Sequence, residues 1–106
     1  MTRTETIYLH ACAKPDAEDG AVIDLYQCDP WTGSDGRIQG CCLEGWWETL
    51  PVQPAARGAE VGIADFDAAL TAGGYRRIDD WRRRSGGSGR IRYSAYASIN
   101  VAVDDV

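Results

Sequence analysis

The feature that most constrains the fold is an alternation of apolar and polar side chains near the end of the chain. Over residues 90–103, nearly every second side chain is apolar and those between are mostly polar. The apolar set is Ile91, Tyr93, Ala95, Ala97, Ile99, Val101 and Val103. A period of two over this length is typical of a strand with one buried face. The segment therefore predicts a long β-strand.

A second strand is predicted just before this one, over residues 78–85. The glycine-rich residues 86–89 between them are typical of a hairpin tip. They do not indicate a phosphate-binding loop, because such a loop needs a helix to follow it, and here a strand follows. Residues 78–103 are therefore expected to form one long hairpin.

Three more strands and one helix are predicted upstream. The strands are expected over residues 4–13, 21–28 and 37–50. The helix is expected to have Asp65 as its N-cap, to bury Phe66 and Leu70, and to end at residues 73–74, which are both glycine. The order β-β-β-α-β-β predicts a single α+β domain over residues 1–106. Its antiparallel sheet of about five strands would carry one short helix on one face.

Charge is unevenly distributed along the chain. The 106 residues include 11 basic and 16 acidic side chains, for a formal net charge of −5. Residues 76–92 nevertheless contain seven arginines and two aspartates, so this segment alone carries +5. The remainder is acidic and is expected to repel a long polyanion. No apolar run approaches the roughly 20 residues of a membrane helix and no cleavable signal is visible, so we expect a cytoplasmic location.

The arginine hairpin, residues 81–93, is the strongest candidate for a binding surface. If its tip is the three residues 86–88, Arg82 faces Arg92 and Arg84 faces Arg90 on one side of the ribbon. Like charges opposite one another are destabilising, so the cluster indicates an anionic partner, either phosphates or an acidic protein surface. The alternative is a solvated face that the chain's own Asp and Glu side chains neutralise. A tip of another length would change the pairing.

Tryptophans are the other candidates for partner contacts. Trp31 lies in a predicted loop over residues 29–36, where its indole is expected to be exposed. Trp46 and Trp47 are adjacent on a predicted strand, so their indoles are expected to point to opposite faces. We take Trp31 and Trp47 as partner-binding residues, because Trp and Arg are favoured anchors of interfaces. The alternative is that they fill the core or pack within a loop.

Few residues suggest catalysis or metal binding. The only histidine, His10, shares a predicted strand face with Cys12, and the sequence shows neither an oxyanion hole nor an orienting acid for them. Cys12, Cys28, Cys41 and Cys42 have no C-x-x-C spacing. This favours reduced thiols over disulfides or a metal site built on His10 and Cys12. We therefore expect no enzymatic activity, no cofactor and no metal.

Residues 66–81 read Phe-Asp-Ala-Ala-Leu-Thr-Ala-Gly-Gly-Tyr-Arg-Arg-Ile-Asp-Asp-Trp. With the hairpin that follows, this segment resembles the tail of small uncharacterised proteins of actinobacterial phages and mobile elements. The resemblance covers residues 64–95 and rests on the pattern A-L-x-x-x-G-[YW]…W. It implies a non-enzymatic accessory protein that binds a protein partner in a bacterial host, for example an inhibitor of a defence system such as an anti-CRISPR protein. The alternative is a small nucleic-acid-binding module that uses the arginine hairpin.

Overall fold

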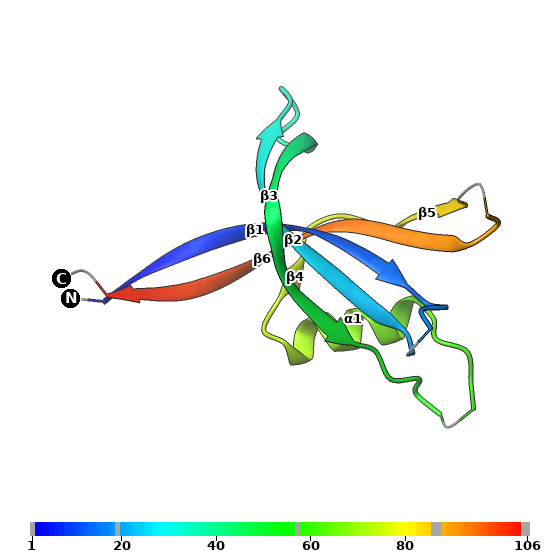
Figure 1. Ribbon diagram of the computed structural model, residues 1–106. Helices are drawn as coiled ribbons and strands as arrows, with labels where there is room; N and C mark the ends of the chain where they lie inside the picture. Colours follow the sequence, from blue (N-terminus) through cyan, green and yellow to red (C-terminus); the bar gives the residue numbers. More distant parts are fainter. Residues whose placement is uncertain (1, 19, 57, 86–87, 105–106) are drawn as a thin grey trace.

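A computed structural model describes residues 2–18, 20–56, 58–85 and 88–104. Within these ranges the chain forms six strands and one helix in the order β-β-β-α-β-β-β (Figure 1). The strands are β1 (Thr2–Lys14), β2 (Val22–Thr32), β3 (Ile38–Pro51), β4 (Arg76–Arg77), β5 (Arg82–Ser85) and β6 (Ile91–Asp104). The helix α1 (Ile63–Ala72) follows β3. The expected antiparallel sheet with one short helix is confirmed, and the expected five strands are corrected to six.

The strands form one antiparallel sheet in the order β3-β2-β1-β6-β4, with β5 also paired to β6. Strand β6 confirms the long strand predicted from the alternation over residues 90–103. It pairs with β1 from Thr2 opposite Asp104 to Ala13 opposite Tyr93. Ala95, in the apolar set of β6, has no exposed surface. The two longest-paired strands therefore form the middle of the sheet and share one buried face.

The predicted strand over residues 78–85 is wrong in its bounds, because the chain forms two short strands with a break between them. β4 ends at Arg77 and β5 begins at Arg82. In the break, the carboxylate of Asp79 accepts a hydrogen bond from Tyr96 N–H at 2.7 Å, where a neighbouring strand would offer a carbonyl. Asp side chains compete with the backbone ladder in this way. The aspartate therefore interrupts the pairing with β6.

The β2–β3 hairpin is longer than predicted, and the expected loop over residues 29–36 is correspondingly shorter. β2 continues to Thr32, and β3 begins at Ile38. Pro30 fits within β2 because the pairing between β1 and β2 ends at Gln27, which leaves that edge free of ladder bonds. Beyond this point the hairpin strands pair only with each other. We call residues 28–43 the β2–β3 arm.

Helix α1 is capped by a side chain at its N-terminus and by backbone geometry at its C-terminus. Its N-cap is Gly62, which corrects the predicted Asp65. Asp65 lies at the third helical position and accepts a hydrogen bond from Gly62 N–H at 2.9 Å, and its charge is favourable at a helix N-terminus. The predicted end at residues 73–74 is confirmed, since Gly74 has a φ of +86°. Tyr75 N–H then donates to the Leu70 carbonyl at 2.9 Å, as in a Schellman motif.

The hydrophobic core lies between α1 and one face of the sheet. Phe66 and Leu70 are buried, which confirms the predicted apolar stripe of the helix. The ring of Phe66 lies 5.6 Å from that of Trp81 and 5.5 Å from that of Tyr93. These contacts tie the helix to β6 and to the residue directly before β5. The hairpin is therefore held at its base by the core, while its other face remains available.

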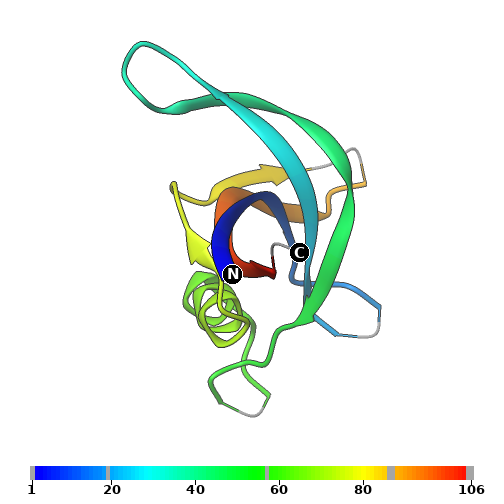
Figure 2. The ribbon, with the colours of Figure 1, turned by 90° about the vertical axis from the view of Figure 1, so that its left-hand side faces the viewer.

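Extended hairpins give the molecule its shape. The Cα radius of gyration is 14.9 Å, against roughly 13 Å for a compact domain of about this length. Figure 1 shows the first part of β1 and the last part of β6 projecting together as a two-stranded ribbon. Figure 2 shows the β2–β3 arm arching away on the side opposite α1. The sheet face that α1 leaves uncovered is therefore bordered by the β2–β3 arm.

Candidate anion-binding pocket

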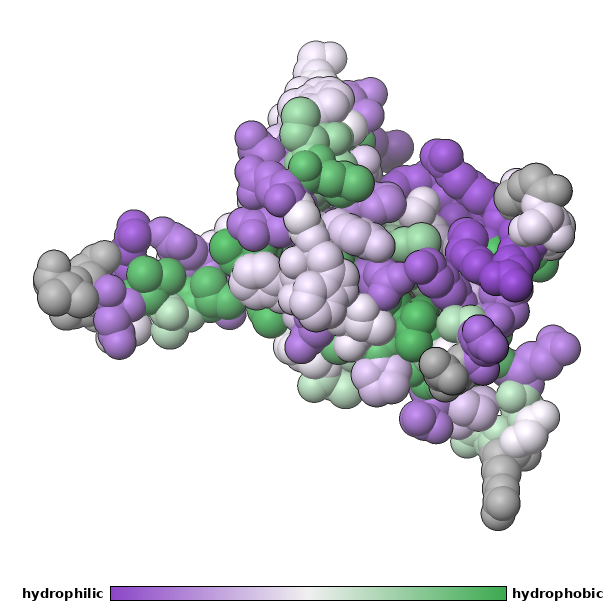
Figure 3. All heavy atoms as spheres, viewed as in Figure 1, coloured by the Kyte–Doolittle hydropathy of each residue, from purple (hydrophilic) through white to green (hydrophobic). Residues whose placement is uncertain are grey.

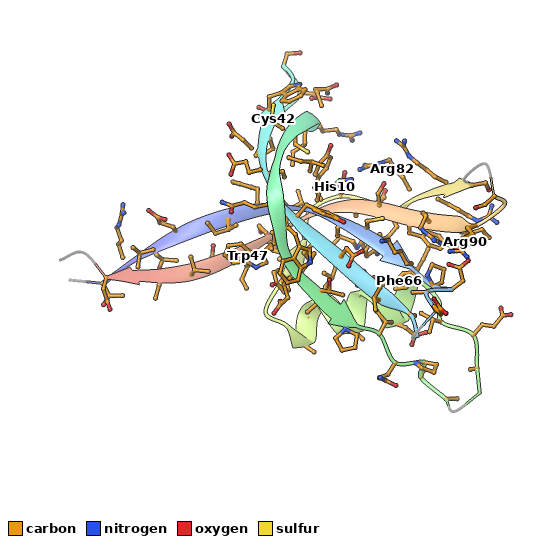
Figure 4. The ribbon with its side chains drawn as sticks, in the orientation of Figure 1. His10, Cys42, Trp47, Phe66, Arg82 and Arg90 are labelled. Atoms are coloured by element: carbon orange, nitrogen blue, oxygen red, sulfur yellow. The ribbon has the colours of Figure 1, made fainter. Side chains whose placement is uncertain are left out.

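A pocket of about 450 Å³ lies on the sheet face opposite α1. We call it the arginine pocket. It is lined by His10 and Cys12 of β1, Ile38 and Gln39 of β3, Arg82 and Arg84 of β5, and Arg92, Tyr93, Ser94 and Tyr96 of β6. Figure 4 shows His10 and Arg82 on this face, with Phe66 and Trp47 on the helix side. The fold thus brings together three of the four arginines that the sequence singles out.

The pairing of β5 with β6 places these arginines and corrects the predicted register. Arg84 lies opposite Arg92, and Arg82 lies opposite Ser94. The expected pairs of Arg82 with Arg92 and of Arg84 with Arg90 are therefore wrong. The actual register differs from the expected one by two residues, and a shift of two keeps every side chain on its own face. Arg82, Arg84 and Arg92 therefore share one face, as predicted, although the predicted pairs are wrong.

The connection between β5 and β6 is longer than the predicted three-residue tip. The pairing closes at Ser85 opposite Ile91. Gly86 and Gly87, two residues of the expected tip, lie outside the described residues. Arg90 lies before the first residue of β6, is exposed, and does not line the arginine pocket. Figure 4 shows it near the far end of the hairpin, away from Arg82.

Two of the three pocket arginines are held by the protein's own carboxylates. Arg82 pairs with Asp79 at 2.7 Å, and Arg92 pairs with Asp16 of the β1–β2 turn at 2.5 Å. The side chain of Arg84 has no ion pair or hydrogen bond within the described ranges. Internal neutralisation, the alternative interpretation of the cluster, therefore applies to Arg82 and Arg92 but leaves Arg84 unpaired.

Aromatic rings fix the inner part of the pocket. The guanidinium of Arg82 lies 5.2 Å from the centroid of the Tyr96 ring, a cation–π arrangement. The rings of Tyr96 and His10 are 5.8 Å apart with an interplanar angle of 60°. Because Asp79 binds both the Tyr96 N–H and the Arg82 side chain, it orients this group as a unit. Arg82 is therefore positioned before any partner arrives.

His10 lines the pocket, although the sequence suggested no role for it beyond a weak pairing with Cys12. Its Nδ1 is shielded from solvent and has no hydrogen-bond partner in the described part of the chain. Burial lowers the pKa of His10, and the charges of Arg82 and Arg84 lower it further. The imidazole is therefore neutral at neutral pH. No pattern in the sequence signals this role, because it depends on β5 lying two strands away.

The geometry offers little to the enzyme hypothesis built on Cys12 and His10. Burial raises the pKa of the Cys12 thiol, so at neutral pH it is protonated and a poor nucleophile. No hydrogen bond joins Cys12 to His10 among the described residues. All four cysteines are unpaired. Burial and the adjacent Cys41 thiol raise the pKa of Cys28 to about 12, so Cys28 is protonated as well.

Trp47, predicted to be a partner-binding residue, is partly buried and packs against the core. Its indole N–H donates to the hydroxyl of Tyr75 at 3.0 Å, and that hydroxyl in turn donates to Glu48. The register with β2 shifts by one residue between Trp46 and Glu48, which makes Trp47 the extra residue of a bulge. A bulge breaks the alternation of faces. Trp46 is therefore the indole that faces outward.

Three large apolar side chains are exposed on or at the base of the β2–β3 arm. Trp31 is 52% exposed, as predicted, and Leu43 and Trp46 are 58% and 65% exposed. The indole of Trp31 lies over Gly40, where a side-chain carbon would collide with it. Figure 3 shows apolar surface on the arm and hydrophilic side chains gathered over β5. Alternation predicted one outward indole in the Trp46–Trp47 pair but not which one, and no pattern in the sequence singled out Leu43.

No protein-family model, curated protein or solved structure matches this chain. Among the residues that the structure describes, no helix has the length and apolar character needed to cross a membrane. In the same residues, no three or more His, Cys, Asp or Glu side chains come together as a group that could hold a metal ion. The site is therefore interpreted from its own residues, and its most distinctive property is its positive charge.

Proposed function

We propose that this protein is a non-enzymatic binding protein whose partner is another protein with an anionic group that enters the arginine pocket. Arg84 carries the proposal, because it lines the pocket and has no internal partner in the described residues. A guanidinium can form two parallel, charge-assisted hydrogen bonds with a carboxylate or a phosphate. Arg84 can do so without giving up a contact that stabilises the fold.

Exposed apolar side chains beside the pocket support a protein as the partner. Ile38 and Gln39, at the start of β3, form one wall of the arginine pocket. The same hairpin exposes Trp31, Leu43 and Trp46. Protein interfaces combine such apolar anchors with arginines, whereas a nucleic-acid backbone requires mainly positive charge. The β2–β3 arm and the arginine pocket are therefore proposed to contact one partner together.

The biological setting is proposed from the resemblance of residues 64–95 to accessory proteins of phages and mobile elements. In that setting the protein acts in the cytoplasm of a bacterial host and binds a component of a defence system, as anti-CRISPR proteins do. A positively charged pocket suits this role, because it can bind an acidic or phosphorylated group on a surface that the defence protein needs. Arg90, at the far end of the hairpin, would contribute long-range attraction rather than a pocket contact.

A comparison of two adjacent arginines tests the proposal. Arg83 follows Arg82 on β5 but does not line the pocket, and it is exposed. Arg84→Glu and Arg83→Glu therefore make the same charge change on the two faces of one strand. In pull-downs from bacterial lysate, with binding then measured on the purified partner, we expect Arg84→Glu to weaken binding by tenfold or more and Arg83→Glu by much less. The proposal is wrong if both variants bind every captured protein equally.

The alternative, a nucleic-acid-binding module, is suggested by the seven arginines of residues 76–92. Phosphate contacts would make the affinity fall steeply with salt. A gel shift with single-stranded and double-stranded DNA at about 50 mM salt, where such contacts are strong, separates the two functions. A shift that Arg83→Glu and Arg84→Glu weaken to the same extent would favour the alternative, since a nucleic-acid backbone follows overall charge.

A further inference from the structure

The arginine pocket concentrates hydrogen-bond donors. Arg82, Arg84 and Arg92 line it together with the hydroxyl-bearing residues Ser94 and Tyr96. Among the described residues, no Asp or Glu lines the pocket. Asp79 and Asp16 bind Arg82 and Arg92 without lining it. A carboxylate can be satisfied by a single guanidinium through two parallel bonds. The pocket therefore offers more donors than a carboxylate can use.

The charge of the hairpin also favours a strongly charged anion. Residues 76–92 carry +5 in total, and among the described residues outside this segment the one carboxylate that pairs with a pocket arginine is Asp16. A doubly charged ligand would leave the hairpin positive. It would also relieve the repulsion between Arg84 and Arg92, which lie directly opposite each other on adjacent strands. Within the pocket itself, Asp79 and Asp16 already pair with two of the three arginines. The preference for a doubly charged ligand therefore rests on the charge of the whole segment and on the number of donors.

We infer that the arginine pocket binds a dianionic phosphate monoester. The inference rests on the proposed function and names the anionic group that the pocket recognises. A monoester presents three terminal oxygens and nearly two charges at neutral pH, whereas a nucleic-acid phosphate has one charge and two free oxygens. The pocket volume of about 450 Å³ falls in the range of small-molecule sites. It has room for part of the group that carries the phosphate.

His10 supplies an internal reporter for this binding. It is the single histidine of the chain, so its ring signals in a proton NMR spectrum belong to one residue. Arg82, Arg84 and Asp79 act on it electrostatically, and the Tyr96 ring packs beside it. An anion among the arginines would offset their charge and stabilise the imidazolium. Binding in the pocket should therefore raise the pKa of His10, whereas binding elsewhere on the hairpin should leave it unchanged.

The experiment is an NMR titration of the full-length protein at about pH 7.5, where a phosphate monoester is largely dianionic. The probes are inorganic phosphate, N-acetylphosphoserine amide, adenosine 5′-monophosphate, diethyl phosphate and acetate. We expect phosphate and at least one monoester to shift the His10 signals saturably. Diethyl phosphate and acetate should bind about tenfold more weakly or worse, because they have one charge and fewer oxygens for the arginines.

The two monoesters separate the two sources of this chemistry. Tighter binding of N-acetylphosphoserine amide would indicate a phosphorylated side chain of a protein. Tighter binding of adenosine 5′-monophosphate would indicate a free phosphorylated small molecule. Either result supports the inference, provided that Arg84→Gln weakens binding about tenfold and Arg83→Gln leaves it unchanged. Both variants are expected to fold, which circular dichroism checks, since neither side chain forms an ion pair or a hydrogen bond in the described ranges.

The inference is overturned if acetate binds as well as phosphate, or if phosphate leaves the His10 signals unmoved. That result would leave the proposed function standing, because a carboxylate-bearing partner could still depend on Arg84. Conversely, saturable phosphate binding with no protein partner that distinguishes Arg84→Glu from Arg83→Glu would overturn the proposed function and keep the phosphate site. The two experiments can therefore fail independently.

Discussion

The two faces of β1 differ sharply although they come from alternate residues of one strand. Leu9, Ala11 and Ala13 have no exposed surface and pack in the core with α1. His10 and Cys12, between them, line a pocket instead. The difference arises because α1 supplies matching apolar side chains to one face only. The other face is bordered by the arginine hairpin and the β2–β3 arm, and the pocket lies between them.

The helix side of the sheet is expected to determine stability, and the pocket side is expected to determine binding. The helix side holds the large buried side chains, and their removal opens cavities. The pocket side holds arginines, of which Arg84 has no internal partner among the described residues. Substitutions on the helix side should therefore change the free energy of unfolding strongly, and those on the pocket side should change it weakly. Measured free energies of unfolding test this difference between the two sides.

The largest effect is expected for Phe66→Ala on the helix side. Phe66 is fully buried, and its ring contacts those of Trp81 and Tyr93. Truncation removes these contacts and leaves a cavity, so we expect the free energy of unfolding to fall by about 3–5 kcal/mol. Urea denaturation followed by tryptophan fluorescence measures this loss. A domain of this size has only about 5–15 kcal/mol in total, so the variant should be close to unfolding.

Ile63→Ala is the matched control on the same helix. Ile63 is 45% exposed, and alanine has the higher helix propensity. We therefore expect its effect to stay within about 0.5 kcal/mol. If Phe66→Ala proves no more damaging than Ile63→Ala, the helix does not cover the core as described. The distinction between the two sheet faces would then lose its basis.

A smaller effect is expected for Asp79→Ala, at the boundary between the two faces. The variant loses hydrogen bonds to Arg82 and to Tyr96 N–H, both at 2.7 Å. It leaves the Tyr96 N–H unpaired and the Arg82 side chain unoriented, which we expect to cost about 2 kcal/mol. Asp80→Ala is the control, since the Asp80 side chain is fully exposed and its ion pair with Arg77 spans 3.7 Å.

Asp80→Ala should change the free energy of unfolding by less than about 0.5 kcal/mol. Equal losses in the two variants would mean that the break between β4 and β5 does not depend on Asp79. Asp79→Asn adds a finer test, because the amide oxygen can still accept from Tyr96 N–H but has no charge for Arg82. It should recover part of the lost stability, and it should affect binding in the arginine pocket more than folding.

Regular patterns in the sequence are predictive here, and local interruptions are not. The alternation of β6 and the apolar stripe of α1 depend on periods that many residues repeat, so both are recovered from the sequence. The break at Asp79 depends on a single side chain that meets the backbone of Tyr96, 17 residues away. The bulge at Trp47 shifts the alternation by one residue. Nothing local in the sequence marks either event.

The candidate site shows the same division. A shared face for Arg82, Arg84 and Arg92 follows from alternation and survives a register error of two residues. Which arginine lacks a partner does not follow, because the ion pair of Arg92 with Asp16 joins residues 76 positions apart. The presence of His10 in the pocket likewise depends on β1 lying beside β6. Sequence patterns therefore find the charges, whereas the pocket itself requires the tertiary arrangement.

The smallest effect is expected from His10, on the pocket side, and it should depend on pH. Burial and the neighbouring arginines lower the pKa of His10 below its ordinary value of 6.5. As pH falls below 6.5, the unfolded state therefore takes up the proton before the folded state does. The free energy of unfolding should be at its full value above pH 6.5 and should decrease on acidification toward the lower pKa of the folded state.

His10→Gln isolates this contribution, because His10 is the only histidine and histidine is the side chain that ordinarily titrates between about pH 5 and 8. Denaturation midpoints of the wild type should decline from about pH 7 to about pH 5.5 more steeply than those of His10→Gln. Saturating phosphate should flatten the wild-type profile, since an anion in the pocket would offset the arginines that oppose protonation. Parallel profiles for the two proteins would show that His10 does not sense this pocket.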